Sequence, residues 1–199
     1  VQALAKVATE VYLPERVDFA TFSSHKFHGL RGVGFVYIKE GKKITPLLTG
    51  GGQEKEMRST TENVAGIAAT AKALRLAMEN QEAFASKTQQ MKEVIRKELA
   101  NYPDVTIFSG EDYFAPHILT FGIKGVRGEV VVHAFEEFDI YISTTSACSS
   151  KAGKPAGTLI AMGVDKSIAQ TAVRLSLDLE NDMSQVCCLL YTSDAADEA

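Results

Sequence analysis

The stretch Ser23-Ser24-His25-Lys26-Phe27-His28-Gly29 decides how this chain folds, because it joins two short apolar segments typical of buried strands. Residues 17–22 (VDFATF) predict the first strand, and residues 33–38 predict the next. Lys26 therefore lies on the connection between strands, where functional side chains are often placed. Two interpretations are open locally: an amine that forms a Schiff base with a carbonyl cofactor, and a solvated lysine in a turn.

The composition is that of an ordinary soluble globular protein, with 199 residues, 45% hydrophobic and 23% charged. A net charge of -4 gives no basic stripe, so we expect no direct binding of nucleic acid. There is no apolar run long enough for a membrane span, so we expect no membrane contact. The three cysteines suggest no disulfide framework, which favours a cytoplasmic location. The four histidines lack metal-ligand spacing with them, so we predict no metal site.

Two long helices are predicted in the middle of the chain. Ser59 and Glu62 have the spacing of a capping box, which places the first helix start within residues 58–63. Such a start either binds a phosphate or carboxylate or simply caps the helix. A break is expected at residues 79–81. The expected inner faces are Val64, Ile67, Ala68, Ala71, Leu74 and Met78 in the first helix, and Phe84, Thr88, Met91, Val94, Ile95 and Leu99 in the second.

The second half of the chain alternates between short strands and short helices, which is typical of a small α+β domain. We therefore expect a domain boundary near residue 80. The predicted strands are residues 105–108, 117–121, 140–142 and 173–177, and the predicted helices are residues 128–138 and 157–162, with a turn at 163–166.

Two stretches of the second half carry candidate chemistry. Cys148 stands in the hydroxyl-rich segment 143–154, which predicts a mobile loop that carries a thiol. Lys151 and Lys154 could favour its thiolate form. Arg174 lies on a predicted strand, where it either binds a carboxylate through two hydrogen bonds or lies on a wet sheet face.

Taken together, these stretches resemble the cysteine desulfurases of the class V aminotransferase family. The resemblance implies an α/β fold, namely the C-terminal part of a pyridoxal-phosphate (PLP)-dependent transferase (fold type I) large domain plus a small α+β C-terminal domain. Residues 1–80 would end the PLP-binding domain, residues 81–186 would form the small domain, and residues 187–199 would be an unrelated or frameshifted tail. The matching motifs are SSHKFHGLRGVG (23–34), GGGQEKEMRSTTEN (50–63), ISTTSACSS (142–150) and VRLSL (173–177).

The resemblance also implies a set of residues that bind pyridoxal 5'-phosphate. Lys26 would form the Schiff base, while Ser23 and His25 would help to hold the phosphate. Gln2 would contact the ring oxygen of the cofactor. Thr61 would reach the phosphate of the cofactor in the neighbouring subunit of a homodimer.

The implied reaction removes sulfur from L-cysteine and leaves L-alanine. Arg174 would bind the substrate carboxylate, and Cys148 would take the sulfur as a persulfide. The sulfur would pass to an acceptor or iron-sulfur scaffold protein, for iron-sulfur cluster assembly or tRNA thiolation. Other open interpretations are a selenocysteine lyase, an aminotransferase, and a non-catalytic module for dimerisation or acceptor docking.

The chain departs from the family pattern in three respects. It opens after the family's first half, so we expect the chain alone to hold the cofactor poorly and to be inactive. Thr60 and Thr145 stand where the family usually has glycine, which a β-branched residue cannot replace at positive φ without strain. The tail beyond Val186 shows no matching helical periodicity, and no function is expected for Cys187 and Cys188.

Overall fold

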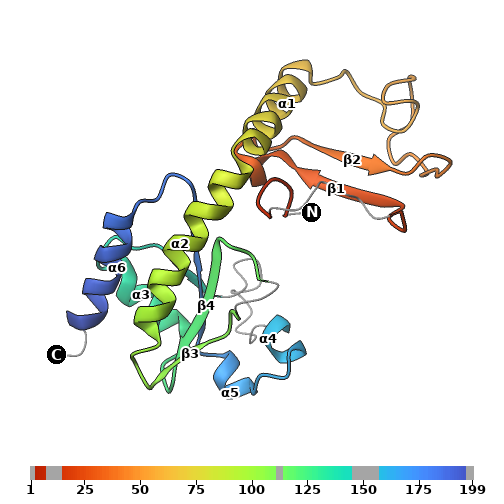
Figure 1. Cartoon of the computed structure of the whole chain (residues 1–199). Coiled ribbons are helices and arrows are strands. Elements are labelled where there is room, and N and C mark those ends of the chain that lie inside the picture. Colours follow the sequence, from red (N-terminus) through yellow and green to blue (C-terminus); the bar gives the residue numbers. More distant parts are fainter. Residues whose placement is uncertain (1–2, 8–14, 111–113, 145–156, 196–199) are drawn as a thin grey trace. The chain divides into compact units, whose positions relative to one another are not determined.

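The computed structural model describes residues 3–7, 15–110, 114–144 and 157–195, with side chains up to Leu190. The chain divides into two compact units, Val1–Glu82 and Ala83–Ala199 (Figure 1). Among the described residues, no helix combines the length and the apolar character needed to cross a membrane.

The first unit is built on a hairpin, as residues 17–38 predict. Strand β1 (Phe19–Ser23) pairs antiparallel with β2 (Gly34–Ile38), and the 3-10 helix η1 (Ser24–Phe27) begins the connection between them. Phe22 lies opposite Phe35, and their rings stack with centroids 4.7 Å apart. Phe27 is buried as well, so the turn that carries Lys26 is packed against the hairpin and does not extend into solvent.

Helix α1 (Val64–Glu79) starts at the end of the predicted segment 58–63, but the predicted capping box of Ser59 and Glu62 is wrong. The N-cap is Asn63, whose side-chain oxygen accepts a hydrogen bond of 3.0 Å from the amide of Gly66. An amide side chain at this position satisfies one of the free N–H groups of the first turn. Ser59 is used elsewhere, since its hydroxyl donates to the carbonyl of Gly51 at 2.9 Å.

The predicted apolar face of α1 is also wrong within the first unit. Val64 and Ile67 are 72% and 48% exposed, whereas Gly66 and Thr70 are the buried residues of this helix. A Cβ at position 66 would come within 2.9 Å of a methyl group of Val33, so the helix approaches the connection after η1 too closely for a larger side chain. Close backbone approach therefore decides which side of α1 is buried.

Helix α2 (Gln81–Leu99) follows after a single residue, Asn80, so the predicted break is confirmed. Its buried side includes Phe84, Met91 and Ile95 as expected, while Val94 is exposed. The buried residue that apolar periodicity could not identify is Lys92, which is 2% exposed.

The second unit contains a four-stranded antiparallel sheet in the order β3-β4-β6-β5. Its strands are β3 (Val105–Ile107), β4 (Ile118–Ile123), β5 (Ser143–Thr144) and β6 (Ala172–Ser176). The predicted strand at residues 140–142 is wrong. The amide of Ile140 donates to the carbonyl of Phe135 and so closes the preceding helix, which leaves the next residues, Ser143–Thr144, to pair with β6.

One face of this sheet forms the main core with α2, α3 (Gly128–Glu136) and α6 (Met183–Ala195) (Figure 1). Leu119, Phe121, Val173 and Leu175 point into this core from β4 and β6. The other face is covered near Ala172 by α4 (Gly157–Ala161) and α5 (Lys166–Ala169). The expected turn is present, with Gly163 at φ 86°, and α5 begins at its last residue, Lys166.

Helix α6 corrects the expectation that the tail lacks helical periodicity. Val186 and Leu189, three residues apart, are buried in the main core, and Leu190 packs against it. Apolar residues at this spacing lie on one side of a helix. That residues 187–199 are unrelated to the family remains a prediction.

Candidate functional site

The Lys26 turn is a short, well-anchored element at the end of β1. Lys26 is half-buried in η1, and no hydrogen bond or ion pair engages its amine in the part of the chain that the structure describes. His28 adopts a left-handed conformation with φ 64° and ends η1, where its amide donates to the carbonyl of Ser24. An uncommitted amine on a rigid turn can react with a carbonyl group.

Ser24 is the anchor of this turn. It is 0% exposed, and its hydroxyl accepts a hydrogen bond of 3.0 Å from Thr70 in α1. Its amide donates to Val33 at 3.0 Å, and its carbonyl accepts from Gly29 at 3.0 Å. Sequence reasoning missed Ser24 because its partner Thr70 lies 46 residues away.

The neighbours of Lys26 that were predicted to hold a phosphate lie beside it in sequence and in structure. Ser23 ends β1, His25 follows in η1, and both are exposed. The turn therefore carries an exposed hydroxyl and an exposed imidazole within three residues of Lys26. Gln2 lies outside the described residues.

Thr61 lies in the segment before α1 and is exposed. Two donors of the helix start are already used, because the amide of Val64 donates to Glu62 at 2.9 Å and that of Gly66 to Asn63. A phosphate at this end would therefore depend on the side chain of Thr61 more than on free amides. The role of Thr61 stays a prediction.

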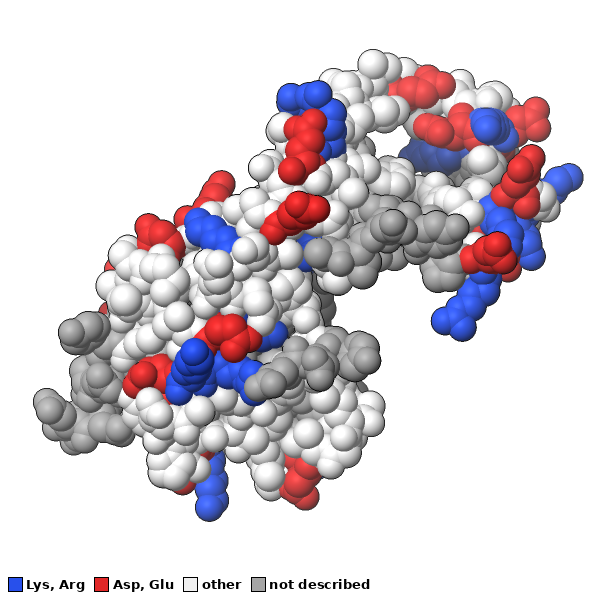
Figure 2. All heavy atoms as spheres, viewed as in Figure 1, with Lys and Arg blue, Asp and Glu red and all other residues white. Residues whose placement is uncertain are grey.

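The connection from β2 to α1 contains an unusual turn. Glu54, Lys55 and Glu56 have φ values of 49°, 55° and 65°, which form three consecutive left-handed residues without glycine. Each such residue costs about 1–2 kcal/mol. Figure 2 shows charges of both signs gathered over this connection. Strained backbone of this kind is found most often at functional segments.

Arg174 lies in the second unit, in the middle of β6. It is opposite Thr120 on β4 and opposite Ser143 on β5. The side chain is half-buried, and its Nε is buried without a hydrogen-bond partner. Both strand neighbours place their side chains on the same face as Arg174, because directly paired residues share a face.

Cys148 lies outside the described residues, but the strand that leads into its segment is described. Ser143 and Thr144 form β5 and pair with Arg174 and Val173. The segment that contains the predicted sulfur acceptor therefore starts directly beside the predicted carboxylate-binding strand.

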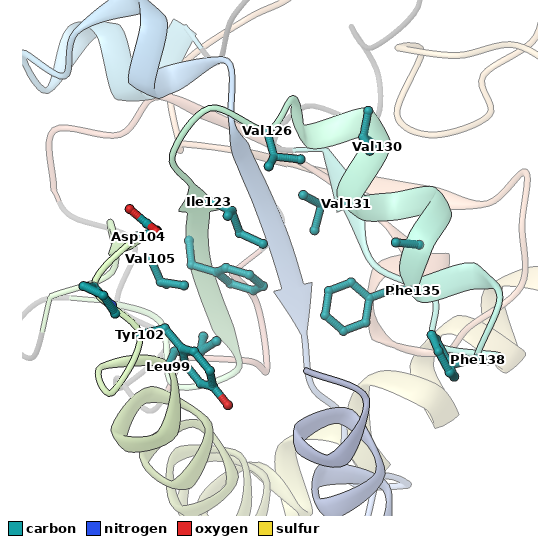
Figure 3. Close-up of a pocket in the computed structure, with 13 residues that line it drawn as sticks. Leu99, Tyr102, Asp104, Val105, Ile123, Val126, Val130, Val131, Phe135 and Phe138 are labelled. Atoms are coloured by element: carbon teal, nitrogen blue, oxygen red, sulfur yellow. The ribbon is translucent and has the colours of Figure 1, made fainter. Parts of the chain in front are cut away.

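A large cavity in the second unit is not a candidate site. It measures about 510 Å³ and lies between the end of α2, strands β3 and β4, and α3 (Figure 3). Its lining is apolar apart from Tyr102 and Asp104, and Phe121 and Ile123 place it on the core face of the sheet. It is therefore on the opposite face from Arg174. Among the described residues, no group of three potential metal ligands occurs.

Lys92 is a buried charge with a structural explanation. Its Nζ donates to the carbonyl of Ala115 at 3.1 Å and so holds the connection that leads into β4. Burial lowers the pKa of Lys92, and the nearby carboxylate of Glu93 opposes this effect. The residue stabilises the sheet and does not contact the candidate site.

Comparison with known proteins identifies the family to which this chain belongs. The model of the family "Aminotransferase class-V" matches residues 5–189, and the chain belongs to this family. The predicted α/β fold is confirmed by a solved NifS-like protein, with a TM-score of 0.86 and 33% identity over 100% of this chain and 51% of that one.

Relatives identified by sequence include a NifS/IcsS protein homolog and several cysteine desulfurases. The chain is 51% identical over 186 residues to a NifS/IcsS protein homolog of Lactobacillus delbrueckii subsp. bulgaricus, which covers 93% of this chain and 48% of that protein. It is 37% identical to the cysteine desulfurase IscS of Clostridium botulinum, over 91% of this chain and 46% of that protein. The cysteine desulfurase CsdA of Escherichia coli superposes with a TM-score of 0.70 and 26% identity, over 92% of this chain and 46% of that one. The chain thus spans about half the length of the relatives it matches.

Proposed function

We propose that this chain supplies the carboxyl-terminal half of a PLP-dependent cysteine desulfurase. The observation that carries the proposal is the register of β5 and β6, in which Ser143 pairs with Arg174. In this register Arg174, the proposed carboxylate-binding residue, lies beside the strand that precedes the segment of Cys148. A transaminase needs no thiol at that place, and the similar proteins named as cysteine desulfurases favour the same interpretation.

The Lys26 turn fits pyridoxal phosphate by the chemistry of its side chains. The amine of Lys26 is uncommitted among the described residues, and Ser23 and His25 offer a hydroxyl and an imidazole to a phosphate. The buried Ser24–Thr70 hydrogen bond keeps this turn in place. When bound, the cofactor would delocalise the negative charge that develops at the substrate Cα. Gln2 and Thr61 complete the proposed set.

The proposed steps use three side chains of the chain. Arg174 holds the carboxylate of L-cysteine with charge-assisted hydrogen bonds. Lys26 removes the Cα proton as a general base. The thiolate of Cys148 attacks the substrate sulfur, and the Cβ–S bond breaks with its electron pair left on Cβ. Protonation of that carbon, together with return of a proton from Lys26 to Cα, gives L-alanine, and the sulfur remains on Cys148 as a persulfide.

The proposal extends to the setting of the enzyme. We expect a cytoplasmic homodimer, in which Thr61 reaches the cofactor of the neighbouring subunit. The persulfide would pass its sulfur to an acceptor or iron-sulfur scaffold protein, for iron-sulfur cluster assembly or tRNA thiolation. These expectations rest on the proposed desulfurase reaction, which the family membership and the names of the relatives support.

The test joins the chain to the amino-terminal half of the Lactobacillus delbrueckii relative, whose matched half is 51% identical to this chain. With pyridoxal phosphate and L-cysteine, the joined protein should release L-alanine and carry a persulfide on Cys148, detected by mass spectrometry. Cys148→Ala should abolish both, whereas Cys187→Ala should change neither. Alanine release that survives Cys148→Ala would disprove the proposed mechanism.

A further inference from the structure

We propose that Thr120 and Ser143 form a three-residue carboxylate site with Arg174, in which the hydroxyl of Ser143 accepts the buried Nε–H while the terminal guanidinium nitrogens bind the ligand. The inference rests on the proposed function for the identity of the ligand, an α-amino acid. Thr120 and Ser143 act in it as positioning residues.

The first support is the geometry of the three strands. Thr120, Arg174 and Ser143 occupy one row across β4, β6 and β5, with Arg174 in the centre. Directly opposed residues have Cβ atoms about 4.5–5.5 Å apart, which is within reach of a short hydroxyl and the Nε of arginine. The two neighbours of Arg174 in this row are thus both hydroxyl-bearing residues.

The second support is the unpaired donor. The Nε of Arg174 is buried and has no hydrogen-bond partner, whereas the side chain as a whole is only half-buried. A ligand therefore reaches the terminal nitrogens and not Nε. A buried donor without a partner costs about 1–3 kcal/mol, so a rotation of Ser143 that supplies an acceptor is favourable. Thr120 can support the guanidinium from the opposite strand.

The third support is the charge of this face. The residues of β4 and β6 that share it are Ile118, Thr120, Gly122, Ala172, Arg174 and Ser176, and none of them is acidic. In the described part of the chain, no ion pair neutralises Arg174. A partly exposed cation among hydroxyls, without a carboxylate on these strands, selects an anionic ligand that can accept two hydrogen bonds.

The arrangement links ligand binding to β5. This strand has only two residues, Ser143 and Thr144. A hydrogen bond from Arg174 to Ser143 adds a side-chain connection to the short backbone pairing. Carboxylate binding would therefore stabilise the strand from which the segment containing Cys148 starts.

The experiment follows the Arg174 Nε–H signal by 15N NMR in the 199-residue chain. Titration with L-alanine should shift this signal to saturation, and L-alaninamide, which lacks the carboxylate, should not. Ser143→Ala and Thr120→Val should each weaken binding by about tenfold, the effect of one hydrogen bond to a charged group. Ser143→Thr and Thr120→Ser, which keep the hydroxyl, should restore it.

Ser176→Ala is the matched control, because Ser176 lies on the same face of β6 but outside the row. It should bind L-alanine like the unmodified chain. The inference is overturned if L-alanine does not shift the Arg174 Nε–H signal. It is also overturned if Ser143→Ala and Thr120→Val keep both the affinity for L-alanine and the shift of that signal. A joined enzyme that forms no Cys148 persulfide, while L-alanine still shifts Arg174, would instead disprove the desulfurase proposal and leave this site standing.

Discussion

Replacement of Gly29 by alanine should disrupt the anchor of the Lys26 turn. A Cβ at this position would overlap the hydroxyl of Ser24 and come within 3.0 Å of its carbonyl oxygen and 3.1 Å of its Cβ. The hydroxyl cannot move away freely, because it already accepts the hydrogen bond from Thr70 in a fully buried place. The new methyl group therefore competes directly with the Ser24–Thr70 contact.

The expected cost follows from these contacts. Insertion of a methyl group into a packed site costs about 1–3 kcal/mol. Loss of the buried hydrogen bond adds about 1 kcal/mol. The reduced freedom of the unfolded chain returns about 0.4–1 kcal/mol, since the φ of Gly29 is accessible to alanine. The net destabilisation of the first unit should be about 1–3 kcal/mol.

Urea unfolding followed by circular dichroism measures this change, and amide hydrogen exchange in α1 assigns it to the first unit. Gly52→Ala is the matched control, because a Cβ there meets nothing within 4 Å and the backbone φ is not positive. The control should be stabilised by about 0.4–1 kcal/mol. If both variants have the same stability, the packing argument for Ser24 is refuted.

A second substitution separates the clash from other effects of alanine. Ser24→Ala removes the hydroxyl that the new methyl group overlaps. The double variant should therefore be more stable than the sum of the two single effects predicts, by about 1 kcal/mol or more. Strict additivity would show that Gly29 and Ser24 do not interact as described.

The remaining predictions concern stability. Lys55→Gly should stabilise the chain by about 1 kcal/mol, because Lys55 is left-handed with φ 55°; Lys43→Gly, at a residue without positive φ, should bring no gain. Asn63→Ala should destabilise α1 by about 1 kcal/mol in urea unfolding, because it removes the N-cap. Ser59→Ala, which removes a hydroxyl hydrogen-bonded to Gly51 and not to α1, should not destabilise this helix. Burial lowers the pKa of Lys92 in the folded chain. Above that pKa the unfolded state binds more protons than the folded state, so stability increases with pH. The unmodified chain should therefore gain stability relative to Lys92→Met as the pH rises towards about 10. A difference that does not change with pH would contradict this explanation.

Local patterns in the sequence predict the elements of this fold better than their packing. Alternation locates β4 and β6, and helical periodicity locates α1 and α2, because each signal is contained in a few consecutive residues. The pairing of β6 between β4 and β5 joins distant segments, so no local pattern contains it. The buried side of α1 is missed for the same reason, since Gly66 and Thr70 face the hairpin through small size and not through apolar character.

The candidate site divides in the same way. Ser23, His25 and Lys26 are close in the sequence, so a single turn carries all three residues. The row formed by Thr120, Arg174 and Ser143 depends on strand order and register, which the sequence does not display. Motif spacing can therefore suggest Arg174, but it cannot show which side chains support it.

The hairpin of β1 and β2 has a practical consequence for the isolated chain. Within the described residues no third strand joins it, so both outer edges keep unpaired backbone donors and acceptors. Phe19, Phe35 and Val36 are exposed on these two strands. Open edges with apolar side chains recruit strands from other molecules. Self-association through intermolecular strand addition should therefore limit the concentration at which this chain stays monomeric, and charged residues introduced on β2 should raise that limit.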